Sequence, residues 1–141
     1  MFTRMGTKMR SELQEELYKK YPALFTEKDL GVTQSCMCWG FEIFDGWHDI
    51  LDKACEAIVA HQGHKKDLPV AFVQVKEKFG GLRIYFNGGD DHVEGIVDMA
   101  ERMSHVTCES CGSPGRSRSG AWVKTFCDTC HEKWLAGFNR F

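Results

Sequence analysis

Apolar residues recur at helical spacing near the start of the chain. Leu13, Leu17 and Tyr21 form a narrow stripe on one helical face. This stripe predicts a helix that begins at Ser11, as the first residue of a capping box. We expect the helix to end before Pro22, because proline disfavours helical geometry in the residue that precedes it.

The same periodicity predicts two further helices. The longer one covers residues 46–61, and its apolar positions are Trp47, Ile50, Leu51, Ala54 and Ile58. Gly63 ends this helix. The other begins at a cap supplied by Asp90 or Asp91, and its apolar positions are Val93, Ile96, Val97 and Ala100.

Residues that alternate between apolar and polar predict strands between these helices. One short strand is expected near residues 39–44, and residues 70–87 are typical of a β-hairpin. Gly80 and Gly81 supply the positive φ that the connecting turn needs. The residues expected to alternate on one side of each strand are Ala71, Val73 and Val75, and then Leu82, Ile84 and Phe86.

This order of elements predicts an α+β fold, with helices packed on a small antiparallel sheet. The hairpin is expected to pair with the strand near 39–44. We expect an α+β core over residues 1–105 and a smaller metal-binding unit over residues 106–141 that packs on the core.

Two Cys-x-x-Cys pairs predict the metal site of that unit. Cys108 and Cys111 are separated from Cys127 and Cys130 by fifteen residues, 112–126, which are enough for a hairpin that brings the pairs together. Four thiolates in this arrangement form a closed tetrahedral shell around one structural zinc ion, with no open position for activating water. Gly112 suits the first pair because it tolerates positive φ. Buried free thiols or two disulfides are the alternatives.

A pair of cysteines, a hairpin and a second pair at the start of a helix is the order found in treble-clef zinc fingers, which this region resembles. The expected helix after Cys130 has four apolar residues on one face. They are Trp134, Leu135, Phe138 and Phe141.

Composition excludes several classes of protein. The apolar fraction of 43% is ample for a core, and the net charge of −2 argues against a strongly basic nucleic-acid footprint. There is no apolar run of membrane-spanning length, and the first residues lack the apolar stretch of a signal peptide. With seven cysteines, these features predict a protein of the reducing cytoplasm. They leave the oligomeric state open.

Three motifs follow one another between about residues 39 and 130: Asp45-Gly46-Trp47, Val75-Lys-Glu-Lys-Phe-Gly-Gly-Leu-Arg-Ile-Tyr85, and Cys108-x-x-Cys111-Gly112. Together they resemble a family of small, mostly uncharacterised proteins encoded by phages and prophages. The resemblance implies a phage gene expressed in bacterial cytoplasm. Small phage accessory proteins often bind and redirect a host protein, including host defence complexes. No activity or catalytic residue transfers from the family.

Cations and one aromatic residue are the candidates for contact with a partner. Some surround the hairpin turn, and others lie in or beside the flexible segment 113–120. The candidates are Lys76, Lys78, Phe79, Arg83, Arg116, Arg118 and Lys124. Such a set suits an acidic protein surface, or a nucleic acid whose base stacks on the aromatic ring. The alternative is an ordinary solvated turn in which Phe79 folds back on the core.

Candidate catalytic sets are incomplete. Asp91-His92 is similar to the Asp-His element of HNH endonucleases, but it precedes both cysteine pairs, whereas that element commonly follows the first pair. His48, Asp52 and Cys55 have the spacing of a nucleophilic set on one helix, with no recognisable oxyanion hole. We therefore expect no catalytic residue.

The remaining cysteines and histidines leave a second metal site open. Cys36 and Cys38 are candidate ligands together with Cys55, His48 or His61, although Cys55 falls on the apolar face of its helix. A pair at His61 and His64 is equally well explained as a solvated helix end. The sequence thus favours a non-enzymatic zinc protein that binds and occludes a host protein. A DNA- or RNA-binding accessory protein is the first alternative, and a hydrolase or nuclease the second.

Overall fold

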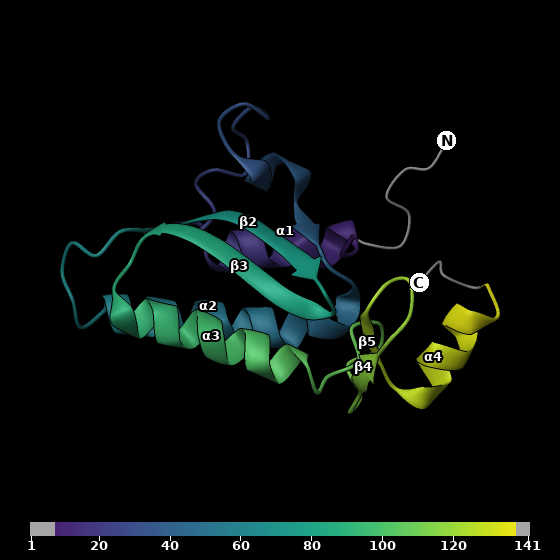
Figure 1. Ribbon diagram of the computed structural model, residues 1–141. Helices are drawn as coiled ribbons and strands as arrows, with labels where there is room; N and C mark the ends of the chain where they lie inside the picture. The colour runs from purple at the N-terminus through teal and green to yellow at the C-terminus, as the bar shows by residue number, and fades with distance from the viewer. Residues whose placement is uncertain (1–7, 138–141) are drawn as a thin grey trace.

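The computed structural model describes residues 8–137. Its elements in chain order are α1 (Ser11–Lys20), η1 (Cys36–Trp39), β1 (Phe41–Glu42), η2 (Asp45–Trp47), α2 (His48–Gln62), β2 (Val70–Lys78), β3 (Gly81–Gly88), α3 (Asp91–Ser104), β4 (Arg116–Arg118), β5 (Lys124–Phe126) and α4 (Asp128–Leu135). Figure 1 shows β4, β5 and α4 gathered at the end of the sheet where β2 ends and β3 begins. The predicted α+β class is confirmed.

The main sheet has three strands in the order β1-β2-β3. β2 and β3 are antiparallel, as expected for a hairpin. β1, however, pairs with β2 in parallel, with Phe41 opposite Val75, so the sheet is mixed and the prediction of an antiparallel sheet was wrong. The reason is the connection: α2 carries the chain from β1 back across the sheet, and such a crossover delivers the next strand in the same direction.

The first strand is shorter than its alternation suggested. Cys36–Trp39 forms a turn of 3₁₀ helix, and only Phe41–Glu42 pairs with the sheet. The buried side chain of Gln14 explains where strand geometry begins, because its carbonyl oxygen accepts a hydrogen bond from the Phe41 amide (3.1 Å). A side chain from another element thus takes the place of a ladder partner.

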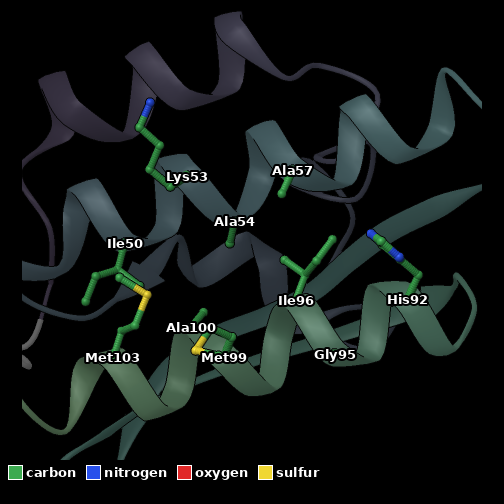
Figure 2. A pocket seen from close by; sticks show the side chains of 10 residues that line it. All are labelled: Ile50, Lys53, Ala54, Ala57, His92, Gly95, Ile96, Met99, Ala100 and Met103. Atoms are coloured by element: carbon green, nitrogen blue, oxygen red, sulfur yellow. The ribbon is translucent and has the colours of Figure 1, made fainter.

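Helices α2 and α3 lie side by side on one face of the sheet, and α1 lies next to α2 (Figures 1 and 2). The Tyr21 hydroxyl at the end of α1 donates to the Asp52 carboxylate (2.6 Å), and Lys20 forms an ion pair with the same group. The predicted apolar stripes face the core. Their fully or largely buried members include Leu17, Ile50, Leu51, Ala54, Ile58, Val93 and Ala100.

The helix caps agree with the sequence at one site and differ at another. Asp90 caps α3 as predicted, because its carboxylate accepts a hydrogen bond from the Val93 amide (3.1 Å). Helix α1 does begin at Ser11, but Arg10 is its N-cap and no side chain caps it. The predicted capping box is wrong because Gln14 turns towards Met9 and Phe41 instead of back to the helix start.

A β-bulge changes which residues of β2 face the core. The register shifts between Phe72 and Gln74, so Val70, Phe72 and Val75 are buried. Ala71 and Val73, which were expected to share a face with Val75, are only partly buried. One extra residue in a strand reverses the alternation beyond it, and the sequence alone carries no clear mark of this.

The hairpin turn lies one residue earlier in the chain than the predicted turn at Gly80 and Gly81. Lys78 pairs with Gly81, so the two loop residues are Phe79 and Gly80, both with positive φ (52° and 78°) as a type I′ turn requires. Gly81 is already in β3. Phe79 therefore occupies a left-handed conformation that a bulky side chain seldom adopts.

Within residues 8–137, no helix is both long enough and apolar enough to cross a membrane.

Candidate metal centre and the surface it supports

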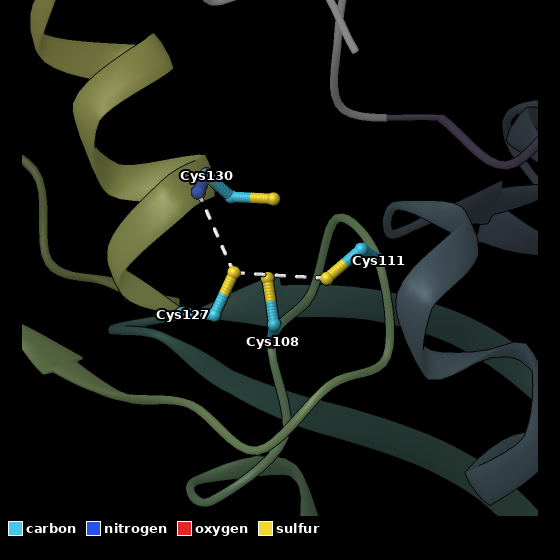
Figure 3. A group of neighbouring side chains, drawn as sticks. All are labelled: Cys108, Cys111, Cys127 and Cys130. Carbon is cyan, nitrogen blue, oxygen red and sulfur yellow. Dashed lines mark hydrogen bonds between the residues drawn. The ribbon is translucent and has the colours of Figure 1, made fainter.

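The four predicted cysteine ligands gather at one point. Cys108 and Cys111 lie in the segment between α3 and β4, and Cys127 and Cys130 lie at the start of α4 (Figure 3). All four sulfur atoms lie within 4.8 Å of one another. The Sγ atoms of Cys111 and Cys127 are 3.7 Å apart. Tetrahedral zinc with Zn–S bonds of about 2.3 Å sets sulfur atoms roughly 3.8 Å apart, so the cluster has the dimensions of a metal shell.

The disulfide alternative does not describe this cluster. All seven cysteines are free thiols. The Cys111–Cys127 separation of 3.7 Å is far beyond the length of a disulfide bond, which is about 2.05 Å.

Local backbone geometry holds each pair in place. Gly112 has the predicted positive φ (82°), and its amide closes the first turn by donating to the Cys108 carbonyl (2.9 Å). The Cys127 sulfur caps α4 by accepting a hydrogen bond from the Cys130 amide (3.4 Å). A helix start favours negative charge, so it stabilises a thiolate at this position.

The four thiols differ in their electrostatic surroundings. Burial raises the pKa of Cys108 and raises that of Cys130 to about 12. Burial acts in the same direction on Cys111, but hydrogen bonds from Ser113 and the neighbouring cysteines outweigh it and bring that pKa to about 6. Four thiolates this close repel one another unless a cation lies between them. The donor set therefore fits a divalent metal that accepts sulfur ligands.

The first cysteine turn is packed directly against the core. The Gly46 amide donates to the Glu109 carbonyl (2.9 Å), and a Cβ atom on Gly46 would collide with the Cys108 carbonyl oxygen. The buried Trp47 donates from its indole nitrogen to the Thr107 carbonyl (2.8 Å). The Asp45-Gly46-Trp47 and Cys108-x-x-Cys111-Gly112 motifs, distant in the sequence, thus form one joint.

The hairpin turn forms a second joint with the metal-binding unit. The Thr125 hydroxyl donates to the Gly80 carbonyl (2.6 Å). The Lys124 ammonium lies between the carboxylates of Glu77 (3.2 Å) and Glu109 (3.9 Å). Glu109 is fully buried, and burial raises its pKa to about 7 even though Lys124 acts in the opposite direction. A buried cation between two carboxylates therefore links β2 to β5.

This arrangement corrects the predicted partner surface. Arg118 is only 9% exposed, and its guanidinium donates to the Phe126 carbonyl (2.8 Å) and to Asp128 (2.8 Å). Lys124 is only 4% exposed, for the reason given above. Arg83 is half-buried and forms an ion pair with Glu101 (2.9 Å). Segment 113–120, which was predicted as a flexible loop, contains strand β4, and the contacts of Arg118 belong to that strand.

The other candidates remain accessible to different extents. Lys78, Phe79 and Arg116 are exposed, and Lys76 is half-buried. Arg116 lies 3.8 Å from Asp128, so part of its charge is balanced within the chain.

Sequence reasoning missed one residue of this surface, Trp122. Its side chain is 71% exposed, and that of Phe79 is 69% exposed. Both line a hollow of about 440 Å³ between the end of β2 and the β4–β5 connection, which we call the aromatic pocket. Its other lining residues are Glu77, Lys78, Ala121, Val123 and Lys124. A tryptophan two residues after Gly120, in a short connection, was the available signal.

The last described helix agrees only in part with its prediction. Trp134 is partly buried and packs against Phe126, with ring centroids 5.5 Å apart. Leu135 is exposed, so it does not share that buried face. α4 is short and begins at Asp128, which turns Leu135 outward. Phe138 and Phe141 lie outside the described residues.

The residues considered for catalysis or a second metal site have other contacts. The Asp52 carboxylate binds Lys20 and Tyr21, and burial raises the pKa of Cys55 well above its ordinary range. The His92 ring stacks on His61 (centroids 3.9 Å apart), and His61 bonds to Asp90 (2.8 Å). Within residues 8–137, the four cysteines are the sole cluster of three or more potential metal ligands.

No protein-family model, curated protein or solved structure matches the chain.

Proposed function

We propose that this chain is a non-enzymatic binding protein, encoded by a phage and acting in bacterial cytoplasm, whose aromatic pocket docks onto a host protein and occludes a functional site there. One zinc ion bound by the four cysteines holds the pocket in shape. The observation that carries the proposal is the pairing of two highly exposed aromatic side chains, Phe79 and Trp122, across one hollow.

The choice of zinc follows from the ligands. Four sulfur atoms at tetrahedral spacing suit zinc or iron, and a closed Cys₄ shell is the usual structural zinc site. The ion would be held by Cys108, Cys111, Cys127 and Cys130. It would contribute to folding and leave no position for a substrate.

The aromatic pocket has the features of a protein-binding surface. Aromatic residues are enriched at interfaces, and tryptophan is among the residues that most often dominate binding energy. Phe79 also keeps a left-handed backbone conformation (φ 52°), which costs a bulky residue about 1–2 kcal/mol. A bulky exposed side chain in such a conformation points to a function for that side chain.

The pocket is supported on a rigid base. The hairpin turn that carries Phe79 is bonded to Thr125, and the strand that follows Trp122 is tied to the core through Lys124. A surface that is already ordered loses little conformational entropy on binding. This suits occlusion, in which a fixed shape covers a site on the partner.

Charge favours a protein partner over a nucleic acid. The nucleic-acid alternative depends on the cations of segment 113–120, Lys124 and the cations of the hairpin, and two of these, Arg118 and Lys124, are buried and paired within the chain. The accessible cations near the pocket are few, whereas committed DNA-binding proteins make roughly six to ten phosphate contacts. Phe79 and Trp122 remain suitable for stacking on bases, so nucleic acid is an outcome that the test must distinguish.

The test is affinity purification from bacterial lysate with matched variants. Phe79→Asn removes the ring but tolerates the left-handed backbone, and Trp122→Ala removes the second ring. We expect both variants to recover the partner at least about tenfold less well than the parent chain, the loss typical of an interface hot spot. Val32→Ala, a change at another exposed apolar residue, is the control and should have no effect.

Two results would overturn the proposal. One is equal recovery of the partner by all variants. The other is recovery of nucleic acid alone, with an affinity that falls steeply with salt and is lost in Lys78→Ala/Arg116→Ala. That second result would support the nucleic-acid-binding alternative.

A further inference from the structure

A second hollow lies between α2 and α3, on the side of these helices that faces away from the sheet. Its volume is about 440 Å³, and nearly all of its lining is apolar. We call it the helix groove, and its lining residues are Ile50, Lys53, Ala54, Ala57, His92, Gly95, Ile96, Met99, Ala100 and Met103. None of these residues belongs to the metal centre or to the aromatic pocket.

The groove has the shape of a trough with small residues along its floor. Figure 2 shows Ile50 beside Met103 at one end and Ala57 near Ile96 towards the other, so the two helices run antiparallel. Met99 is 56% exposed and Met103 is also exposed. Methionine is flexible and adapts to partners of different shape. The lining from His92 to Met103 covers three turns of α3, or about 16 Å at 1.5 Å per residue.

Gly95 lies beside open space in the groove. It lies inside α3, where glycine is less favourable than alanine because of its backbone freedom. A Cβ atom added there would meet no atom within 4 Å, so no neighbour within the described chain requires its absence. A missing side chain on the wall of a groove does, however, permit another backbone to approach closely.

The exposed charges beside the groove are mainly acidic. On α2 and α3 the exposed acidic residues number five, against two exposed basic residues. The acidic residues are Asp49, Glu56, Asp91, Glu94 and Asp98, and the basic ones are Lys53 and Arg102. The formal charge of these exposed side chains is therefore −3, compared with −2 for the entire chain. Both cations are already paired on their own helix, Lys53 with Glu56 and Arg102 with Asp98.

We infer that the helix groove binds an amphipathic α-helix of another protein, with an apolar stripe that enters the groove and basic residues on its flanks. The length of three turns matches such a helix, whose side chains at i, i+3, i+4 and i+7 reach one face. Gly95 and Ala54 have little or no side chain, so the backbone of the bound helix can come close to α2 and α3. Met99 and Met103 pack against the apolar stripe of the bound helix. The acidic residues beside the groove attract the basic residues of that helix. This site is independent of the aromatic pocket.

The probe is a fluorescent 18-residue peptide of leucine and lysine, with leucine at i, i+3, i+4 and i+7. One control peptide replaces each lysine with glutamate, and another has the same composition in scrambled order. Titration of the full, metal-bound chain should give saturable anisotropy changes with the lysine peptide, at least about tenfold tighter than with either control. Its affinity should fall as salt is raised, because the flanking charges are exposed.

Variants of the chain distinguish peptide binding in the helix groove from nonspecific binding. Gly95→Leu should weaken binding at least about tenfold while the chain keeps or gains thermal stability, since leucine favours helix and fills open space. Glu94→Lys/Asp98→Lys should reverse the preference towards the glutamate peptide. Phe79→Asn and Trp122→Ala should leave peptide binding unchanged, so failure here and failure of the proposed function are distinguishable.

Three results would overturn the inference. They are equal binding of the ordered and scrambled peptides, full binding by Gly95→Leu, and self-association of the parent chain that Gly95→Leu abolishes while no peptide binds. The last would assign the groove to a second copy of this chain, and sedimentation at increasing concentration would reveal it.

Discussion

In the α+β core, 21 buried residues from every helix and strand before Cys108 form one apolar cluster. In the metal-binding unit, the corresponding cluster among the described residues has three members, Cys108, Phe126 and Cys130, with Cys127 and Trp134 partly buried beside them. Two of those three members, Cys108 and Cys130, belong to the cysteine cluster of the candidate metal centre. The same chain therefore contains one region stabilised by apolar burial and another that has little to bury once its cysteines are set aside.

This difference in apolar burial means that the metal-binding unit depends on the core for its stability. A segment as short as residues 106–137 buries too little apolar surface to fold alone, so it needs a metal or a neighbour. The cysteine cluster offers a site for a metal on one side, and the contacts of Glu109 and Thr125 with Gly46 and Gly80 supply the neighbour on the other. The aromatic pocket lies between the core and the metal-binding unit. Its shape therefore depends both on apolar burial in the core and on the contacts that hold the unit in place.

The largest expected effect comes from breaking the metal shell. In Cys127→Ser, or after treatment with a strong chelator, we expect residues 106–137 to lose protection from hydrogen exchange while α2, β2, β3 and α3 keep theirs. Structural zinc in small fingers contributes about 10–16 kcal/mol of apparent binding energy, more than this unit can replace. Elemental analysis should find one zinc per parent chain and none in the variant.

Cys36→Ser is the matched control for that experiment, because Cys36 is exposed and lies outside the cluster. It should retain both the metal and the protection. A parent chain without metal, or with iron, would contradict the zinc assignment. A core that melts together with the unit would show that the two regions fold as one.

A smaller effect is expected from the buried ion pair between the regions. Lys124→Met leaves the carboxylates of Glu77 and Glu109 without their cation, and breaking a buried pair in this way costs about 3 kcal/mol or more. Urea unfolding monitored by fluorescence and circular dichroism measures the change. Lys124→Met/Glu77→Gln should recover part of the loss, because one of the two unpaired charges is then removed.

Lys133→Met is the control, since Lys133 is an exposed lysine on α4 and should change stability by no more than about 0.5 kcal/mol. Equal effects of Lys124→Met and Lys133→Met would mean that the ion pair does not hold the two regions together.

The smallest effect is expected at the far end of the core, at Asp90. A hydrogen bond with His61 lowers the Asp90 pKa from 3.8 to about 2, helped by the Val93 amide. A pKa lowered in the folded state contributes stability that is present above about pH 4 and is lost as the pH falls towards 2. Asp90→Asn keeps the helix cap but removes the charge. Its stability should be lower at pH 5 and should decline less between pH 4 and 2.

Circular dichroism in the Cys127→Ser background would follow this acid response in the core alone, without a contribution from metal release. Asp90 also lies 3.5 Å from the Lys65 ammonium. The same acid dependence with and without Asp90→Asn would show that the contacts of Asp90 with His61 and Lys65 do not affect stability.

Sequence patterns located most elements correctly where the cause was local. The periodicity of residues 46–61 and the Asp90 cap both depend on neighbours in the chain, and both were confirmed. The strand predicted near 39–44 is present but limited to Phe41–Glu42, where Gln14 bonds to the Phe41 amide. The expected alternation of Ala71, Val73 and Val75 was wrong because a β-bulge interrupts β2. A pattern of neighbouring residues carries no information about contacts with residues that are distant in the sequence.

The predicted partner surface shows the same contrast between features with a local cause and features that depend on distant residues. Arg118 was predicted in a flexible segment with Lys124 beside it, and both were expected to be accessible to a partner. Neither local pattern indicates that Arg118 bonds to Phe126 and Asp128 or that Lys124 lies between Glu77 and Glu109. Trp122 lines the aromatic pocket together with Phe79, which lies 43 residues earlier in the chain, so the sequence around Trp122 does not indicate the pocket.

Spacing along the chain was enough to predict the four candidate sulfur ligands, the class of fold and the apolar faces of α2 and α3, because it dictates which side chains share a turn or a helical face. The parallel direction of β1 beside β2, the burial of two predicted surface cations, the aromatic pocket and the helix groove are set by the three-dimensional packing of the chain. These features arise where elements distant in the sequence meet, and their energies depend on burial and on partners that no local pattern specifies.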